Sequence, residues 1–151
     1  MSGERILVVE DDLVVSKVLE HTFLAEGYQV VAVADANEAM RAAQNQKPDL
    51  MILDLTLVND SALNGILDGF SLLSWLRYTL ADTDFPVIIH TADTSPQVDA
   101  HAKAWKVFAV FRKGDCMPEL VKAVRAALDD YHAKHPYAEA PPSALQMSSA
   151  A

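Results

Sequence analysis

The residues PDLMILDLTL, at positions 48–57, decide the fold class. The four consecutive apolar residues Leu50–Leu53 are typical of a strand that is buried on both faces of a parallel sheet. Asp54 follows at the point where this strand would end. A half-exposed strand would alternate apolar and polar residues instead. We therefore expect helices to cover both faces of the sheet.

Similar apolar runs recur along the chain, separated by segments with helical spacing. The predicted strands are Arg5–Val9, Gln29–Val33, Leu50–Leu53, Pro86–Thr91 and Val107–Arg112. The first predicted helix turns Val15, Val18, Leu19, Thr22 and Phe23 inward, and four more helices begin near Asp35, Asp68, Ser95 and Cys116. Five strands that alternate with five helices imply an α/β fold, with a parallel sheet and right-handed crossovers.

The composition excludes several classes of protein. Of the 151 residues, 51% are hydrophobic and 22% are charged, which favours one folded domain over global disorder. The net charge of −9 argues against direct contact with nucleic acid or with an anionic membrane. The single cysteine permits no internal disulfide. No apolar run approaches the roughly 18 residues of a membrane span, so we expect a cytoplasmic protein without membrane insertion.

Polar side chains gather where the predicted strands end. Because all five strands would run the same way, their carboxyl ends share one edge, where ligands bind in such sheets. The residues at these ends are Glu10, Asp11, Asp12, Asp54, Thr91 and Lys113. Neighbouring carboxylates repel one another unless a cation lies among them, and oxygen ligands suit Mg²⁺. A metal, a lysine, a hydroxyl and a nucleophilic carboxylate together indicate a phosphoryl-transfer site.

The sequence resembles the receiver domain of two-component response regulators, in particular the stand-alone regulators of the chemotaxis type. The resemblance covers residues 4–132, and its motifs occur in the expected order at strand ends. The matching segments are ILVVEDD at 6–12, GYQVVAVADANEAM at 27–40, PDLMILDLTL at 48–57, DGFSLLSWLR at 68–77, PVIIHTA at 86–92 and FRKG at 111–114. The resemblance implies a flavodoxin-like (βα)5 fold with the strand order 2-1-3-4-5.

The resemblance also assigns a metal site. Asp11 matches the direct Mg²⁺ ligand, and Glu10 matches the second residue of the acidic pocket. Asp54 and the main-chain oxygen of Thr56 match the remaining protein ligands. Mn²⁺ is the alternative cation. Asp12 falls one position beyond the acidic pair, and we expect it to cap the first helix.

The remaining roles implied by the resemblance concern phosphoryl transfer. Asp54 matches the phosphoacceptor, Thr91 the switch hydroxyl and Lys113 the lysine that pairs with the phosphoryl group. The implied donor is a histidine kinase or a histidine phosphotransfer protein, and the output is an unknown downstream protein target. The sequence leaves open whether the protein forms a dimer. The domain would catalyse only its own phosphorylation and dephosphorylation, so it would not be an enzyme in the usual sense.

Three positions depart from the usual pattern of this family. Val58 replaces the proline that commonly stands four residues after the phosphoacceptor, and Gly114 replaces the proline after the lysine. Val110 occupies the position of the aromatic residue that often takes part in the switch. We therefore expect the switch to depend mainly on the loop that follows the fourth strand.

The predicted domain spans residues 1–134 and contains a long loop at 55–67. This loop is longer than the usual connection of about 2–6 residues, and we expect it to pack beside the site and to tune partner choice or dephosphorylation. Residues 135–151 include three prolines and many small residues, so we expect a disordered tail, too short for a DNA-binding output domain.

Two other functions remain open from the sequence. A metal-dependent phosphohydrolase also uses an aspartyl nucleophile, but such enzymes typically carry a second acid two residues later, where this chain has Thr56. A receiver-like module that is never phosphorylated would serve only for protein interaction. The intact set of Glu10, Asp11, Asp54, Thr91 and Lys113 argues against that reading.

Overall fold

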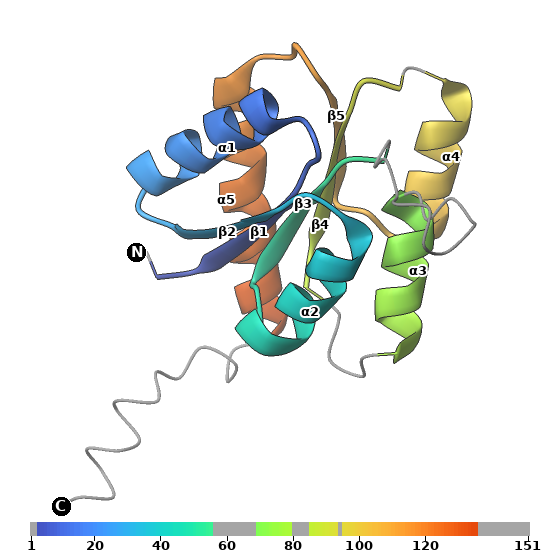
Figure 1. Cartoon of the computed structure of the whole chain (residues 1–151), viewed down its shortest axis with the longest axis horizontal. Helices are drawn as coiled ribbons and strands as arrows, with labels where there is room; N and C mark the ends of the chain where they lie inside the picture. Colours follow the sequence, from blue (N-terminus) through green and yellow to red (C-terminus); the bar gives the residue numbers. More distant parts are fainter. Residues whose placement is uncertain (1–2, 56–68, 80–84, 94, 136–151) are drawn as a thin grey trace, which may run out of the picture.

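The computed structural model describes residues 3–55, 69–79, 85–93 and 95–135. Strands and helices alternate along the chain (Figure 1). They are β1 (Arg5–Val9), α1 (Leu13–Ala25), β2 (Gln29–Val33), α2 (Ala36–Gln46), β3 (Leu50–Leu53), α3 (Gly69–Thr79), β4 (Val87–Thr91), α4 (Pro96–Ala104), β5 (Ala109–Arg112) and α5 (Met117–Lys134). Most of the predicted loop at 55–67 and the predicted tail after His135 lie outside the described residues, so both remain predictions.

The five strands form one parallel sheet in the order β2-β1-β3-β4-β5, which confirms the predicted topology. Helices α1 and α5 cover one face of this sheet, and α2, α3 and α4 cover the other (Figure 1). None of the helices in the described ranges is long and apolar enough to cross a membrane.

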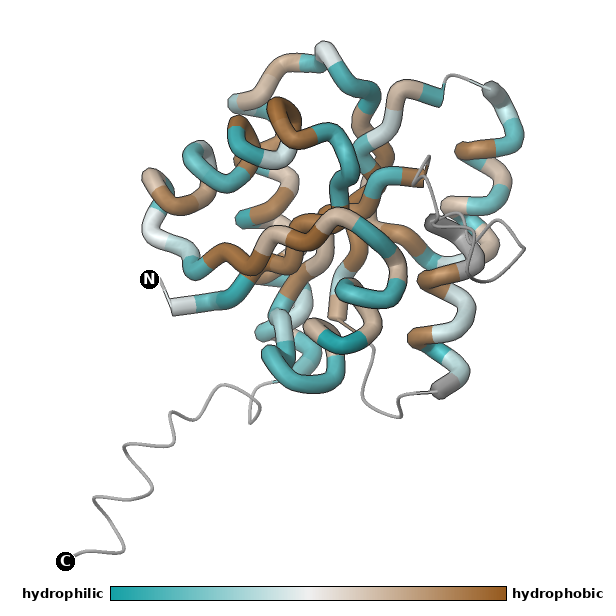
Figure 2. The backbone as a smooth tube through the Cα atoms, in the orientation of Figure 1, coloured by the Kyte–Doolittle hydropathy of each residue, from teal (hydrophilic) through white to brown (hydrophobic). Residues whose placement is uncertain are grey.

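The apolar residues of β3 contribute side chains to the core on both faces of the sheet. Met51 and Leu53 pack into the cluster beneath α2 and α3, whereas Leu50 and Ile52 pack into the cluster beneath α1 and α5. All four side chains are at most 1% exposed. Figure 2 shows the same arrangement as hydrophobic strands at the centre and mixed hydropathy on the surrounding helices. Successive residues of a strand point to opposite faces, so a strand between two helical layers must be apolar throughout.

Two predicted strands begin later than the sequence indicated. β4 begins at Val87 and not at Pro86, because proline has no N–H to donate to the ladder. β5 begins at Ala109 and not at Val107. The N–H of Val107 donates to the carbonyl of Ala102 over 2.9 Å, so it closes the end of α4 and does not join the sheet.

The predicted inward face of α1 is wrong at one position. Leu19 and Phe23 are at most 1% exposed, as expected, and Ser16 is also buried. Val18, however, is 47% exposed. The helix carries apolar residues on more than one side, so helical spacing alone could not identify which of them face the sheet.

Candidate functional site

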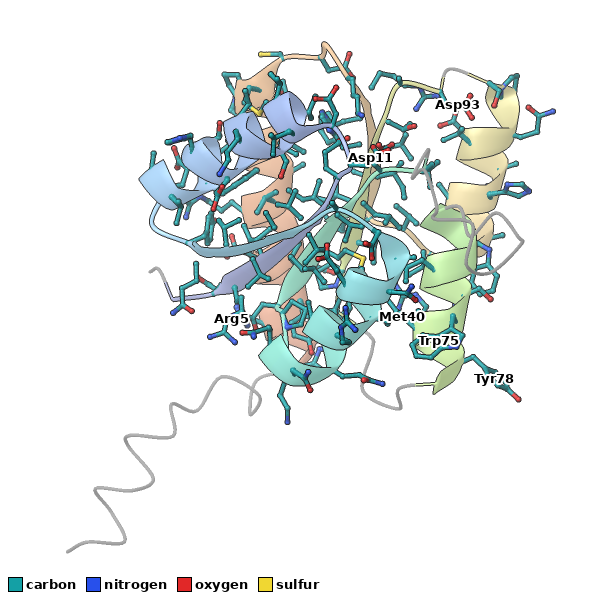
Figure 3. The ribbon with its side chains drawn as sticks, in the orientation of Figure 1. Arg5, Asp11, Met40, Trp75, Tyr78 and Asp93 are labelled. Carbon is teal, nitrogen blue, oxygen red and sulfur yellow. The ribbon has the colours of Figure 1, made fainter. Side chains whose placement is uncertain are left out.

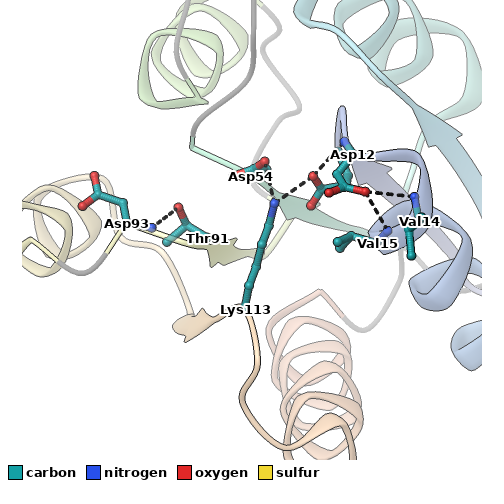
Figure 4. Close-up of polar contacts among 8 residues, drawn as sticks. Asp12, Val14, Val15, Asp54, Thr91, Asp93 and Lys113 are labelled. Atoms are coloured by element: carbon teal, nitrogen blue, oxygen red, sulfur yellow. Dashed lines mark hydrogen bonds and ion pairs between the residues drawn. The ribbon is translucent and has the colours of Figure 1, made fainter.

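The polar residues predicted at the strand ends lie at one edge of the sheet (Figure 4). Glu10 follows β1, Asp54 follows β3, Thr91 ends β4 and Lys113 follows β5. Backbone hydrogen bonds between neighbouring strands set the positions of these residues. The N–H of Asp54 donates to the carbonyl of Val9 over 3.0 Å, and the N–H of Lys113 donates to the carbonyl of Thr91 over 2.8 Å. Backbone pairing therefore brings together side chains that are distant in the sequence.

Lys113 bridges two buried carboxylates. Its Nζ atom lies 2.9 Å from Oε2 of Glu10 and 3.1 Å from Oδ2 of Asp54 (Figure 4). The side chains of Glu10 and Asp54 are each 1% exposed, and that of Lys113 is 20% exposed. Burial lowers the pKa of the ammonium, but its hydrogen bonds to Glu10 and Asp54 outweigh burial and raise that pKa overall. Lys113 therefore stays charged within the site.

The acidic residues Glu10, Asp11 and Asp54 form a cluster that could hold a metal ion. One carboxylate oxygen of each lies within 4.8 Å of the others. Burial raises the pKa of Glu10 to about 7, although its hydrogen bond from Lys113 acts in the opposite direction. Oε1 of Glu10 is buried and has no hydrogen-bond partner among the described residues. An unpartnered carboxylate oxygen beside two further carboxylates fits a hard divalent cation such as Mg²⁺.

Asp12 has a different role from its two acidic neighbours. Its Oδ1 atom accepts hydrogen bonds from the N–H groups of Val14 at 2.9 Å and Val15 at 3.3 Å (Figure 4). It therefore caps α1, as the sequence predicted. Its own N–H donates to Oε2 of Glu10 over 3.1 Å, which ties the start of α1 to the acidic cluster. Thr56, the other residue predicted to contribute to the metal site, lies outside the described residues.

The hydroxyl of Thr91 is already engaged in a hydrogen bond. Thr91 is fully buried, and its Oγ1 atom accepts from the N–H of Asp93 over 3.1 Å (Figure 4). Oδ1 of Asp93 in turn accepts from the N–H of Ser95 over 2.8 Å, and Ser95 precedes α4. Our sequence reasoning did not identify Asp93. An aspartate two residues before Ser95-Pro96 is typical of a turn that leads into a helix, and this signal could have identified it.

His90 lies beside the site and is buried. It is 6% exposed, and its Nδ1 atom has no hydrogen-bond partner among the described residues. Burial lowers the pKa of His90, and the positive charge of Lys113 lowers it further. The imidazole is therefore held in its neutral form. Its burial within β4 is that of a residue that packs in the sheet.

The turn after β5 fixes the backbone on either side of Lys113. Oδ2 of Asp115 accepts from the N–H of Arg112 over 2.7 Å, and the N–H of Asp115 donates to the carbonyl of Arg112 over 3.0 Å. Gly114 has a φ of 98°, a conformation that side-chain-bearing residues rarely adopt. Glycine at this departure from the family pattern therefore permits a tight turn, which holds Lys113 against the acidic cluster.

An apolar groove on α1 lies next to the acidic cluster. Leu13, Val14 and Val18 are 71%, 72% and 47% exposed, and they line a shallow groove of about 510 Å³ together with Lys17 and His21. Exposed apolar residues that are contiguous commonly mark a surface that binds another protein. Figure 3 shows Asp11 at the edge of the sheet beside the start of α1.

The fold and the site together define an α/β domain with an acidic, lysine-bridged pocket at the carboxyl edge of its sheet. Residues 6–125 match the family model of the response regulator receiver domain, so the chain belongs to this family. It is a receiver domain of the two-component response regulators.

Several known proteins are similar to this chain. The transcriptional regulatory protein PrrA of Mycobacterium tuberculosis is 32% identical over 130 residues, which are 85% of this chain and 51% of that protein. The chain thus spans about half the length of the first curated relatives that it matches, which are named as regulators.

Solved structures show the same fold. The chemotaxis protein CheY4 of Vibrio cholerae has a TM-score of 0.71 and 25% identity, covering 83% of this chain and 98% of that one. A CheY-like receiver domain protein of Methanospirillum hungatei has a TM-score of 0.77 and 21% identity, covering 87% of this chain and 98% of that one.

Proposed function

We propose that this receiver domain accepts a phosphoryl group on Asp54 from the phosphohistidine of a histidine kinase or histidine phosphotransfer protein. The observation that carries the proposal is the position of Asp54. Asp54 directly follows the central strand, and its buried carboxylate lies within the acidic cluster, 3.1 Å from the ammonium of Lys113. A carboxylate in such a setting is a nucleophile whose reaction with an anionic phosphoryl group is supported by a neighbouring positive charge.

Glu10, Asp11 and Asp54 would hold Mg²⁺, or alternatively Mn²⁺, and the main-chain oxygen of Thr56 is the further ligand that the resemblance implies. The bound cation supplies charge neutralisation for the oxygens of the phosphoryl group. The unpartnered Oε1 of Glu10 supports this assignment, because a buried carboxylate oxygen without a hydrogen bond is stabilised by a cation.

The protein's own residues would then carry out the transfer. An oxygen of Asp54 forms a bond to phosphorus while the bond between phosphorus and the donor's imidazole nitrogen breaks, and the imidazole keeps the electron pair. Lys113 neutralises part of the charge of about −1.5 to −2 that the phosphoryl group adds at neutral pH. The hydroxyl of Thr91 donates a hydrogen bond to a phosphoryl oxygen.

This last step couples the site to α4. In this proposal the side chain of Thr91 turns toward the phosphoryl group and so loses the hydrogen bond that its Oγ1 accepts from the N–H of Asp93. Asp93 also accepts a hydrogen bond from Ser95 at the start of α4, so the change at Thr91 would rearrange the loop between β4 and α4. Val110, at the position of the usual aromatic residue, packs partly buried against the core. The rearranged surface at α4 would bind the downstream protein target.

The phosphodonor would dock on the groove of α1. Leu13, Val14 and Val18 give this surface an apolar character, and it adjoins the acidic cluster through Asp12. A donor that covers these residues gains about 25 cal/mol for each Å² of apolar surface buried, while its phosphohistidine is brought near Asp54.

The proposal is tested with a phosphorylated histidine phosphotransfer protein, Mg²⁺ and the full chain. We expect one phosphoryl group to be transferred per chain, and no transfer to Asp54→Asn. Steady hydrolysis of a phosphate ester such as p-nitrophenyl phosphate, without any phosphohistidine donor, would instead indicate a phosphohydrolase. A correctly folded chain that accepts no phosphoryl group from any phosphohistidine donor or from acetyl phosphate would indicate an interaction module.

A further inference from the structure

A second cavity, of about 560 Å³, lies at the end of the sheet opposite to Asp54. Its walls come from the end of α3, the residues before β4, the connection from α4 to β5 and the last turns of α5 (Figure 1). The strands are parallel, so the cavity adjoins the N-terminal ends of β4 and β5, whereas the acidic cluster adjoins carboxyl ends. Its volume is within the range of sites that bind small molecules.

The apolar part of this cavity includes aromatic rings beside Pro86 and Val107. Phe85 is only 6% exposed and Phe108 is 41% exposed. The ring of Tyr131 stacks on that of His135, with centroids 4.3 Å apart and an interplanar angle of 29°. A planar ligand could cover the exposed ring of Phe108 and gain both apolar burial and stacking.

The polar part of the cavity is mainly basic. Arg77, Lys106 and Lys134 line it, and they are three of the twelve lysines and arginines in the chain. Asp130 is the acidic residue in the lining, and Nζ of Lys134 lies 3.1 Å from its Oδ2 atom. Basic residues therefore outnumber acidic ones here, although the whole chain has a net charge of −9. Such a local reversal of charge favours an anion.

Lys106 occupies a backbone position that ordinarily favours glycine or asparagine. Its φ is 58°, and its N–H donates to the carbonyl of Lys103 over 3.2 Å at the end of α4. A lysine here is conformationally less favourable than asparagine, which tolerates this region more readily. Replacing Lys106 by asparagine should therefore remove the charge without disturbing the turn.

We propose that this cavity binds a small planar anion, that is, an aromatic ring bearing a sulfonate, carboxylate or phosphate group. The ring packs against Phe108, and the anionic group pairs with Lys106, beside the ion pair between Lys134 and Asp130. This proposal concerns a site separate from the acidic cluster and does not depend on phosphoryl transfer.

The test uses the full chain and 8-anilinonaphthalene-1-sulfonate, an aromatic anion whose fluorescence rises on binding. We expect saturable binding to one site. Lys106→Asn and Phe108→Ala should each weaken binding at least fivefold, and adenosine 5′-monophosphate should compete. The matched control is Leu13→Ala combined with Val18→Ala, which alters the other apolar groove and should leave binding unchanged. Circular dichroism verifies that each variant folds. If Phe108→Ala is not folded, the affinity of Lys106→Asn alone tests the proposal.

Two outcomes would overturn the proposal. The first is unchanged affinity in Lys106→Asn. The second is loss of binding in the α1 control, which would assign the dye to that groove.

Discussion

The Nζ atom of Lys113 lies 3.1 Å from Oδ2 of Asp54, although 59 residues separate them in the sequence. The same ammonium lies 2.9 Å from Glu10. One cation therefore joins residues that follow β1, β3 and β5, of which β1 and β3 are neighbours and β5 is separated from β3 by β4. Because both carboxylates are buried, their electrostatic environment depends strongly on Lys113. Single substitutions can separate its contribution to the stability of the fold from its effect on metal binding.

Lys113→Gln should destabilise the fold and strengthen metal binding. Removing the cation leaves the buried carboxylates of Glu10 and Asp54 without their shared partner, which should lower the free energy of unfolding by about 1–3 kcal/mol. Mg²⁺ no longer competes with an ammonium, so its dissociation constant should fall by about threefold or more. Urea unfolding and titration calorimetry measure the two effects. Lys122→Gln, at an exposed position on α5, is the control. Weaker Mg²⁺ binding in Lys113→Gln would contradict this account.

The adjacent residues Asp11 and Asp12 should respond in opposite ways. Asp11→Asn should weaken Mg²⁺ binding by roughly tenfold or more, because one of three clustered carboxylates is lost, and should leave stability unchanged or higher, because repulsion is relieved. Asp12→Ala should lower stability by about 1 kcal/mol through loss of the helix cap. Urea unfolding measures the change in stability of each variant, and titration calorimetry measures its affinity for Mg²⁺. If Asp12→Ala had the larger effect on Mg²⁺ affinity, the roles would be reversed.

His90 should make stability depend on pH. Burial lowers the pKa of His90, so the unfolded chain takes up this proton at a higher pH than the folded chain. The contribution of His90 to stability is therefore complete above the unfolded pKa of about 6.5 and is lost as the pH falls through the lower folded pKa. His90→Val should reduce the loss of unfolding free energy between pH 7 and pH 5, measured by urea titration at each pH. Ile88→Val, a packing change on the same strand, should not. An identical pH slope in His90→Val would refute the claim.

The exposed apolar face of α1 should matter for one class of phosphodonor only. Leu13→Ala combined with Val18→Ala removes apolar surface from the groove. A loss of about 1–2 kcal/mol of docking energy corresponds to a roughly fivefold to thirtyfold fall in the transfer rate from a phosphotransfer protein. Labelling by acetyl phosphate, which needs no docking surface, should be unaffected. Tyr78→Ser is the control, because Tyr78 is 93% exposed on α3 and projects away from Asp11 (Figure 3). Equal losses with both donors would point to damage of the site itself.

Much of the fold was predictable because parallel strands must be apolar on both faces. Leu50–Leu53 identified the central strand, and the shared direction of the strands predicted that Glu10, Asp54, Thr91 and Lys113 would meet at one edge. The structure places them there. The strand order came from the family resemblance and is confirmed.

Other features depend on tertiary contacts that helical spacing does not encode. The exposure of Val18 was not predictable, because α1 has apolar residues on more than one side. The hydrogen bond between Asp93 and Thr91 joins a loop to a strand end, and the cavity at Lys106 arises only where four separate segments converge. The role of the segment at 55–67 and the disorder of the tail at 135–151 stay predictions from the sequence.

The most direct test of the central claim is to locate the phosphoryl group. The full chain is treated with acetyl phosphate and Mg²⁺ and then reduced with borohydride, which converts an aspartyl phosphate to homoserine. Peptide mass spectrometry then identifies the converted residue. We predict homoserine at position 54, and none in Asp54→Asn or in protein treated with EDTA. Labelling at another residue, or labelling that persists in a folded Asp54→Asn variant, would contradict the assignment of Asp54 as the phosphoacceptor.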